Sequence, residues 1–247
     1  MTGASPAVRL VGVGMGPGDP ELVTVLAVRR LAEADLVLVP VMSRDQQGRA
    51  EATVRAHLTH DRITRVVFAL DEQAVSPRRQ AAWEAAADRV LEAFDAGART
   101  VAFATIGDPT IYSTFTYLAQ TVRARRSDVT VETVPGITAM QALAAATGTV
   151  LCEGTEPLVL LPLTAGGDRL DEALASGASV VVYKGGRAMD QVRQALARHH
   201  RLGGAVVGAS LGLPDEQVGT VERWNGPGPY LSTVIAPAPR DRRGGKL

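Results

Sequence analysis

The sequence predicts an α/β protein built from two domains. Short apolar runs alternate with helical stretches along the first 149 residues, a pattern typical of strands joined by helices. A glycine-rich loop separates the first apolar run from the first helical stretch, and a polar interruption follows Gly148. Because crossover helices connect parallel strands, the alternation favours a largely parallel sheet that is covered on both faces.

The elements of the first domain follow from their residue patterns. Residues 8–13 form a short apolar run that ends in glycines, and residues 21–34 carry apolar side chains at helical spacing. The alanine-rich stretch 77–96 is closed by Gly97, a common helix terminator. The other expected strands are 36–41, 63–70, 100–104 and 129–134, and the other expected helices are 51–57, 111–125 and 139–147.

A second domain follows the polar residues 153–157. We therefore expect domains at residues 7–149 and 156–239, followed by a frayed tail at 240–247. The expected strands of the second domain are 158–163, 180–183, 205–207 and 232–236, and its expected helices are 168–175 and 188–200.

Composition and charge exclude several classes of protein. The 247 residues are 46% hydrophobic, and 26 basic residues balance 26 acidic ones, so no net field favours nucleic acid or membrane. Cys152 is the only cysteine, which excludes an internal disulfide and a thiolate metal cluster. No signal segment is visible, and no run reaches the roughly 18 apolar residues of a membrane span, so we expect a cytoplasmic protein.

The glycine-rich loop Gly-Val-Gly-Met-Gly-Pro-Gly-Asp-Pro occupies residues 12–20. Such a loop lets the backbone turn sharply and approach a ligand closely. The dinucleotide spacing G-x-G-x-x-G fails because Pro17 stands at the third glycine position, and Pro40 ends the strand where a ribose-binding acid is expected. A nicotinamide site and a tight turn without a ligand nevertheless stay open as alternatives.

Two more loops follow strands at comparable positions. Residues 105–113 include Asp108, which either helps to bind a ligand or caps the following helix. Residues 134–139 repeat the arrangement after the next strand. Because open α/β sheets bind ligands at the carboxyl ends of their strands, two polar loops at neighbouring ends favour one shared cleft.

Together these three segments resemble the tetrapyrrole methylases, which are S-adenosylmethionine-dependent enzymes. The resemblance extends from Val8 to about Ala236 and is strongest to the branch that methylates C20 of precorrin-2. Four segments carry it: Gly-Pro-Gly-Asp-Pro-Glu-Leu-Val-Thr at 16–24, Gly-Asp-Pro-Thr-Ile-Tyr-Ser-Thr-Phe at 107–115, Tyr-Lys-Gly-Gly-Arg at 183–187 and Leu-Pro-Asp-Glu-Gln-Val at 213–218.

The resemblance implies a fold and an activity. It implies a mostly parallel N-terminal sheet, a mixed C-terminal sheet, an interdomain cleft and a homodimer. The implied reaction converts precorrin-2 to precorrin-3A in cobalamin biosynthesis, with S-adenosylmethionine as the methyl donor. Another precorrin or cobalt-precorrin methylase is the nearest alternative, and a nicotinamide oxidoreductase or a non-catalytic tetrapyrrole-binding module belongs to a different class. An RNA methylase of the same superfamily is disfavoured because no basic face is evident.

The resemblance also implies the cofactor contacts. They fall on Pro17, Ile106, Gly107, Asp108, Ile111, Thr138, Ala139, Lys184 and Leu211. Lys184 stands where many relatives carry methionine, which leaves its role open between cofactor packing and the binding of a substrate carboxylate. Leu211 stands at a position that is often glycine in relatives.

The chemistry of methyl transfer limits what else to look for. The sulfonium is an activated electrophile, so alignment with an electron-rich carbon supplies much of the acceleration. A base is needed only to remove the proton from the methylated carbon, and Asp19 is the candidate, with a helix N-cap as its alternative role.

The eight carboxylates of precorrin-2 require cationic partners. Arg44, Arg49 and Arg187 are candidates, because guanidinium groups bind carboxylates in a bidentate manner. A solvated surface loop is the alternative for Arg44 and Arg49. His199 and His200 end a helix, where they favour its negative terminus, and we expect no metal site.

Overall fold

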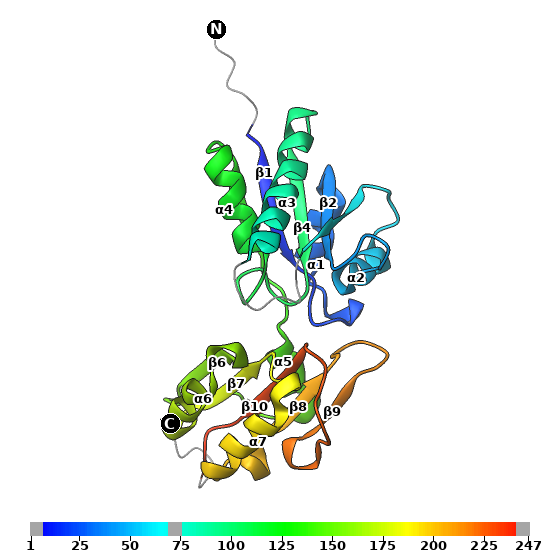
Figure 1. Ribbon diagram of the computed structural model, residues 1–247. Helices are drawn as coiled ribbons and strands as arrows, with labels where there is room; N and C mark the ends of the chain where they lie inside the picture. Colours follow the sequence, from blue (N-terminus) through cyan, green and yellow to red (C-terminus); the bar gives the residue numbers. More distant parts are fainter. Residues whose placement is uncertain (1–6, 69–75, 241–247) are drawn as a thin grey trace. The chain divides into compact units, whose positions relative to one another are not determined.

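The computed structural model describes residues 7–68 and 76–240, which form two compact units, Met1–Thr138 and Ala139–Leu247 (Figure 1). Helix α5 (Ala139–Thr147) packs against strands of the second unit. The boundary expected at residues 149–156 would leave α5 in the first domain, whereas its contacts place it in the second. Residues 241–247 of the expected tail lie outside the described residues.

The first unit has one parallel five-stranded sheet with the order β3-β2-β4-β1-β5. Its strands are β1 (Arg9–Gly14), β2 (Leu36–Val41), β3 (Ile63–Val67), β4 (Thr100–Thr105) and β5 (Thr130–Val134). Its helices are η1 (Pro20–Leu22), α1 (Val25–Glu33), α2 (Arg49–His57), α3 (Pro77–Asp95) and α4 (Phe115–Arg125). The parallel sheet predicted for this domain is confirmed.

Alternating apolar side chains build a core on each face of this sheet. Leu10 and Phe103 point into the cluster that contains the buried residues of α3 and α4. Their strand neighbours Val11 and Ala102 point into the opposite cluster, which contains residues of α1 and α2. The sheet is therefore covered by helices on both faces (Figure 1).

The second unit contains a mixed five-stranded sheet with the order β6-β7-β10-β8-β9. Its strands are β6 (Leu158–Pro162), β7 (Ser179–Tyr183), β8 (Val206–Ala209), β9 (Gln217–Thr220) and β10 (Ser232–Ala236). Besides α5, its helices are η2 (Leu163–Ala165), α6 (Gly167–Ala175), η3 (Gly186–Ala188), α7 (Met189–Arg198), η4 (Leu202–Gly204) and η5 (Val221–Arg223). Only β6 and β7 are paired in parallel, which confirms the predicted mixed sheet.

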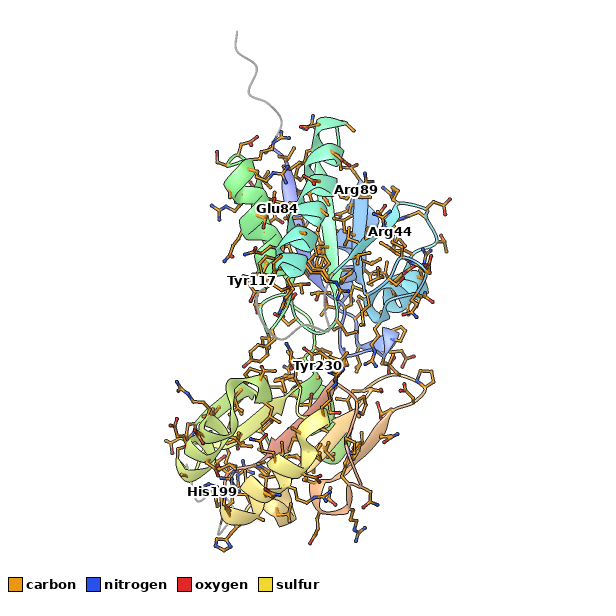
Figure 2. All side chains as sticks on the ribbon, viewed as in Figure 1. Arg44, Glu84, Arg89, Tyr117, His199 and Tyr230 are labelled. Atoms are coloured by element: carbon orange, nitrogen blue, oxygen red, sulfur yellow. The ribbon has the colours of Figure 1, made fainter. Side chains whose placement is uncertain are left out.

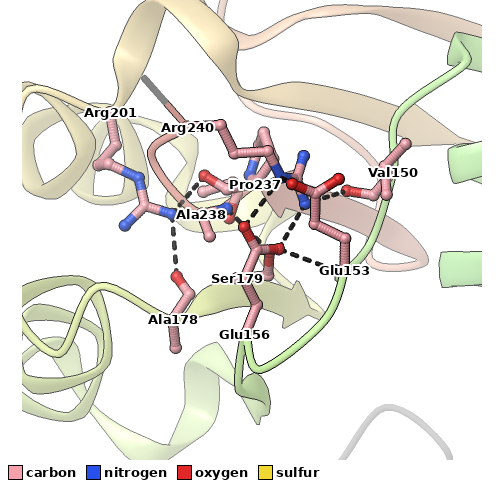
Figure 3. Close-up of polar contacts among 10 residues, drawn as sticks. Val150, Glu153, Glu156, Ala178, Ser179, Arg201, Pro237, Ala238 and Arg240 are labelled. Carbon is pink, nitrogen blue, oxygen red and sulfur yellow. Dashed lines mark hydrogen bonds and ion pairs between the residues drawn. The ribbon is translucent and has the colours of Figure 1, made fainter. Parts of the chain in front are cut away.

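A buried arginine fixes the end of the central strand β10. The Arg201 guanidinium donates to the carbonyl oxygens of Ala178 and Ala236, at 2.9 and 3.0 Å (Figure 3). The Arg240 guanidinium forms an ion pair of 2.6 Å with Glu156. These contacts attach the chain after β10 to segments that lie far away in sequence.

Two expected helices differ from the structure, and one strand was not expected. The single helix expected at 21–34 is interrupted, because the Thr24 hydroxyl caps α1 by accepting a hydrogen bond from the Ala27 N–H at 3.1 Å. Helix α4 begins at Phe115 rather than at 111, because the intervening residues form the loop after β4. The short polar edge strand β9 was not expected at all. Residues 69–70 of the expected third strand lie outside the described residues, and no described helix has the length and apolar character needed to cross a membrane.

Candidate functional site

The three loops singled out in the sequence follow β1, β4 and β5, which are neighbours in the sheet. Because these strands are parallel, all three loops leave the same edge, where open α/β sheets bind ligands. The sequence placed polar loops after strands, but only the sheet order shows that these three strand ends adjoin.

Glycines from all three loops meet at a tight backbone junction. A β-carbon at Gly136 would lie 2.1 Å from the Gly107 carbonyl oxygen, and one at Gly14 would lie 2.6 Å from the Gly136 nitrogen. The Gly107 N–H also donates to the Gly16 carbonyl oxygen at 2.6 Å. The close approach therefore requires residues without side chains at Gly14 and Gly136, whereas the left-handed φ of +68° favours glycine at Gly107.

Asp108 joins the second loop to the third. Its buried carboxylate accepts hydrogen bonds from the Thr110 N–H at 2.7 Å, from the Thr110 hydroxyl and from the Gly136 N–H at 2.9 Å. Burial raises the pKa of Asp108, but these hydrogen bonds outweigh burial and hold the pKa below its ordinary value. Asp108 is thus an ionised carboxylate that holds the second loop against the third. The side chain does not cap α4, which begins seven residues later at Phe115.

The side of Gly107 where a β-carbon would stand is open. This residue has a left-handed φ of +68°, and apart from its chain neighbours no described atom lies within 4 Å of the position where a β-carbon would stand. Ile106 and Ile111 are half-buried on the same loop. The second loop therefore presents backbone and apolar surface beside an open space, which fits a cofactor with polar and apolar parts.

Tyr112 is a residue of this loop that the sequence reasoning missed. Its φ of +50° is uncommon for a residue with a side chain, and such strain is concentrated at functional sites. The side chain is 45% exposed, while partial burial raises the pKa of its phenol. The sequence includes Tyr112 in the segment 107–115 that carries the family resemblance, but gives no separate signal for its role.

The glycine-rich loop is anchored by caps and by helix α2. Asp19 caps η1, because its carboxylate accepts a hydrogen bond from the Glu21 N–H at 2.8 Å. The buried Thr53 hydroxyl of α2 lies 3.4 Å from the Gly18 carbonyl oxygen, and a His57 ring nitrogen lies 2.9 Å from the Pro20 carbonyl oxygen. Pro17 is buried within this loop. The capping role that was the alternative for Asp19 is therefore present in the structure.

Arg44 and Arg49 occupy different surroundings. Arg49 is half-buried at the first turn of α2, where its carbonyl oxygen lies 3.3 Å from the Thr53 hydroxyl. Arg44 is exposed, and its carbonyl oxygen accepts a hydrogen bond of 2.7 Å from Arg65 (Figure 2). Of the two, Arg49 lies on the helix that holds the glycine-rich loop, whereas the Arg44 side chain extends from the surface.

A buried carboxylate orders the helix that carries Arg49. Glu51 of α2 is fully buried and pairs with the guanidinium groups of Arg55 and Arg65, at 2.8 and 2.6 Å. Burial raises the pKa of Glu51, but the hydrogen bonds from these arginines lower it by more. The net result is a pKa below the ordinary value. The ion pairs hold α2 against β3, from which Arg65 extends.

In the second unit, Lys184 and Arg187 lie on the loop after β7. The Lys184 Nζ lies 5.6 Å from the centre of the Tyr230 ring, and the Arg187 Cζ lies 5.7 Å from it. Lys184 has a left-handed φ of +61°. Two of the cations chosen from the sequence are thus gathered at one aromatic ring, which the sequence did not indicate.

Leu211 and Ala139 belong to the packing around α5. Leu211 is 6% exposed and shares a cluster with Leu143 of α5, and Ala139 packs against the same cluster. Thr138, which is buried, immediately precedes α5. Among the described residues, no group of three or more His, Cys, Asp or Glu side chains is placed to hold a metal ion.

Comparison with known proteins identifies the family. The family model described as Tetrapyrrole (Corrin/Porphyrin) Methylases matches residues 9–223. The chain belongs to the tetrapyrrole methylase family. Its fold is shared by a uroporphyrin-III C-methyl transferase from Thermus thermophilus, solved in complex with S-adenyl homocysteine, at a TM-score of 0.62 and 22% identity, over 92% of this chain and 97% of that one. A cobalt precorrin-4 methyltransferase matches at a TM-score of 0.68 and 22% identity, over 93% and 94% of the two chains.

Two curated members of the tetrapyrrole methylase family match most of the chain. The precorrin-2 C(20)-methyltransferase of a Sinorhizobium species is 34% identical over 242 residues, which cover 95% of this chain and 97% of that protein. The cobalt-precorrin-2 C(20)-methyltransferase of Salmonella typhimurium is 28% identical over 235 residues, which cover 92% and 95% of the two chains.

Proposed function

We propose that the protein transfers the methyl group of S-adenosylmethionine to C20 of precorrin-2, which gives precorrin-3A in cobalamin biosynthesis. The observation that carries this proposal is the 34% identity, over nearly the full length of both chains, to a protein named for that reaction. The junction of three loops at adjoining strand ends supports it, because that edge is where a cofactor binds in an open α/β sheet.

The residues of the first unit have separate roles in this proposal. S-adenosylmethionine supplies an activated methyl group when it is bound. Pro17, Ile106, Gly107 and Ile111 line the space for it, and Thr138 lies in the third loop. Asp108 stabilises the second loop by accepting a hydrogen bond from the Thr110 N–H and joins it to the third loop by accepting one from the Gly136 N–H, so its contribution to cofactor binding is to position the loops.

Three further assignments extend the proposal to the second unit and to the substrate. Ala139 and Leu211 contribute to cofactor binding through their backbone, because both side chains pack in the apolar cluster around α5. Arg44, Arg49 and Arg187 bind substrate carboxylates, and Asp19 removes the proton from the methylated carbon. We further propose that the protein acts as a homodimer in the cytoplasm. Light scattering coupled to gel filtration tests whether the protein is a dimer.

The activity is tested with labelled S-adenosylmethionine and precorrin-2, with the product analysed by mass and carbon NMR. One added methyl group at C20 is expected. A parallel reaction with cobalt-precorrin-2 decides between the two substrates that the names of the relatives present. Methylation at another carbon, or of neither substrate, would refute the proposal.

Cofactor choice is tested separately by calorimetry. We expect binding of S-adenosylhomocysteine and none of NAD, because Pro17 breaks the dinucleotide spacing of the glycine-rich loop. Tight binding of NAD without binding of S-adenosylhomocysteine would instead support the oxidoreductase alternative.

A further inference from the structure

Two loops of the second unit are joined at the place where Lys184, Arg187 and Tyr230 meet. The Gly228 N–H donates to the Gly186 carbonyl oxygen at 2.7 Å. A β-carbon at Gly186 would lie 2.0 Å from the Pro229 carbonyl oxygen, so the backbones are in direct contact. The segment after β7 and the loop before β10 are therefore in direct backbone contact beside the three side chains.

Two like charges share a single aromatic ring on this support. The Lys184 ammonium and the Arg187 guanidinium lie 5.6 and 5.7 Å from the centre of the Tyr230 ring, within the range of cation–π attraction. The negative π-face of the ring attracts a cation that lies over it, so Tyr230 holds both side chains within its reach. Figure 2 shows Tyr230 at the edge of the second unit.

The surroundings of the pair point to an anionic ligand. Arg187 is exposed and forms no ion pair with any described residue. Lys184 reaches the ring from a left-handed backbone conformation, a strained geometry that is found where function demands it. A purely structural cation–π contact would need only one of the two cations.

We infer that Lys184, Arg187 and Tyr230 form one carboxylate-binding group for the tetrapyrrole substrate, in which Tyr230 is a positioning residue for the two cations. The inference rests on the proposed function and extends it. It assigns Lys184 to the substrate rather than to the cofactor, and it adds Tyr230, which the sequence reasoning did not select. A guanidinium can orient a carboxylate through two parallel hydrogen bonds, and an ammonium adds electrostatic attraction to the polyanion.

The test uses the full chain and two readouts. The KM for precorrin-2 is measured in turnover, and the Kd for uroporphyrin I, a stable octacarboxylate, is measured by fluorescence without turnover. The variants are Lys184→Met, Arg187→Met, Tyr230→Leu and Tyr230→Phe. Arg169→Met, in α6, is the matched control because Arg169 is also an exposed arginine of this unit. Melting temperatures and S-adenosylhomocysteine affinity are recorded for each variant.

Arg187→Met and Lys184→Met are each expected to raise the KM and the Kd about tenfold, as for the loss of one charge-assisted hydrogen bond. Tyr230→Leu should have a similar effect, whereas Tyr230→Phe keeps the ring and should stay close to wild type. The double variant of Arg187→Met with Tyr230→Leu should be little worse than Arg187→Met alone, because both act on the same contact. Affinity for S-adenosylhomocysteine should not change.

Several outcomes would overturn the inference. Wild-type KM and Kd values in both Met variants would do so, as would independent, multiplicative effects of Arg187→Met and Tyr230→Leu. A wild-type protein that neither methylates precorrin-2 nor binds uroporphyrin I would count against it as well. A protein that binds the octacarboxylate through these residues but methylates another carbon would leave the inference standing and refute only the proposed function.

Discussion

At the scale of single residues, the two aspartates of the loops have roles that geometry separates. Asp108 is buried and accepts two hydrogen bonds from Thr110 in its own loop and one from Gly136 in the third loop, whereas Asp19 caps a short helix in the glycine-rich loop. An ionised carboxylate that already accepts three hydrogen bonds is poorly suited to accept a proton from substrate. The base assignment therefore stays with Asp19.

Asp108→Ala should lower the free energy of unfolding by about 2 to 4 kcal/mol, because it removes three hydrogen bonds and leaves the Gly136 N–H without its acceptor. It should also weaken S-adenosylhomocysteine binding after correction for the folded fraction, since the loops lose their connection. Urea denaturation and calorimetry measure the two effects. Thr110→Val, which removes only the hydroxyl donor, should fall between wild type and Asp108→Ala. Normal affinity in folded Asp108→Ala would assign Asp108 to stability alone.

Asp19→Asn separates the two roles of Asp19. Asparagine is as good an N-cap as aspartate, so stability should stay within about 0.5 kcal/mol of wild type. If Asp19 is the base, turnover should fall about 10²- to 10⁴-fold while cofactor affinity is retained. Single-turnover rates with precorrin-2 measure the effect. Asp19→Ala is the comparison, and equal turnover in wild type and Asp19→Asn would show that the residue is only a cap.

At the scale of elements, the sequence could predict most strands and helices because their apolar periodicity is strong. The ends of the helices were harder to predict. Thr24 interrupts the helix expected at 21–34 through one hydrogen bond, which the apolar periodicity does not reveal. Strand β9 is short, polar and at the sheet edge, so it carries no alternating apolar pattern. The ion pair of Glu51 with Arg65 could not be predicted either, because Arg65 lies on another element.

The junction of the three loops makes Gly136 intolerant of a side chain. Gly136→Ala places a methyl group 2.1 Å from the Gly107 carbonyl oxygen, so the loops must separate. We expect a loss of about 1 to 3 kcal/mol in stability, as for overpacking, and a larger relative loss of S-adenosylhomocysteine affinity. Gly203→Ala is the control, because a β-carbon there would meet no atom within 4 Å. Unchanged cofactor affinity in Gly136→Ala would show that the junction does not shape the cofactor site.

Helix α2 should make stability depend on pH in the acid range through Glu51. Its pKa is lowered on folding, so its ion pairs stabilise the protein above the ordinary value of 4.5 and are lost as the pH falls through the lowered pKa. Glu51→Gln should therefore be less stable than wild type at neutral pH and show a flatter decline below pH 4.5. Urea midpoints measured from neutral pH to below pH 4.5 test this expectation. Glu21→Gln is the control, because Glu21 is an exposed acid. Parallel acid limbs in wild type and Glu51→Gln would exclude this role.

At the scale of the whole molecule, each unit has apolar clusters on both faces of its own sheet. The sequence predicted two α/β domains because strands and helices alternate, and the glycine motifs located the loops at the strand ends. The order of the strands was not readable, since it depends on contacts between residues far apart in the chain. The contacts of Lys184 and Arg187 with Tyr230 could not be predicted either, because Tyr230 belongs to a separate loop.

The position of β10 at the centre of the second sheet has a consequence for how the protein is made. The first sheet has all its strands once Val134 has been synthesised, whereas the second lacks the strand between β7 and β8 until residues 232–236 emerge from the ribosome. The N-terminal unit can therefore mature while translation continues. The C-terminal unit must wait, with the backbone N–H and C=O groups along one edge of β7 and one edge of β8 unpaired, so it is the part of the nascent chain in greater need of chaperone protection.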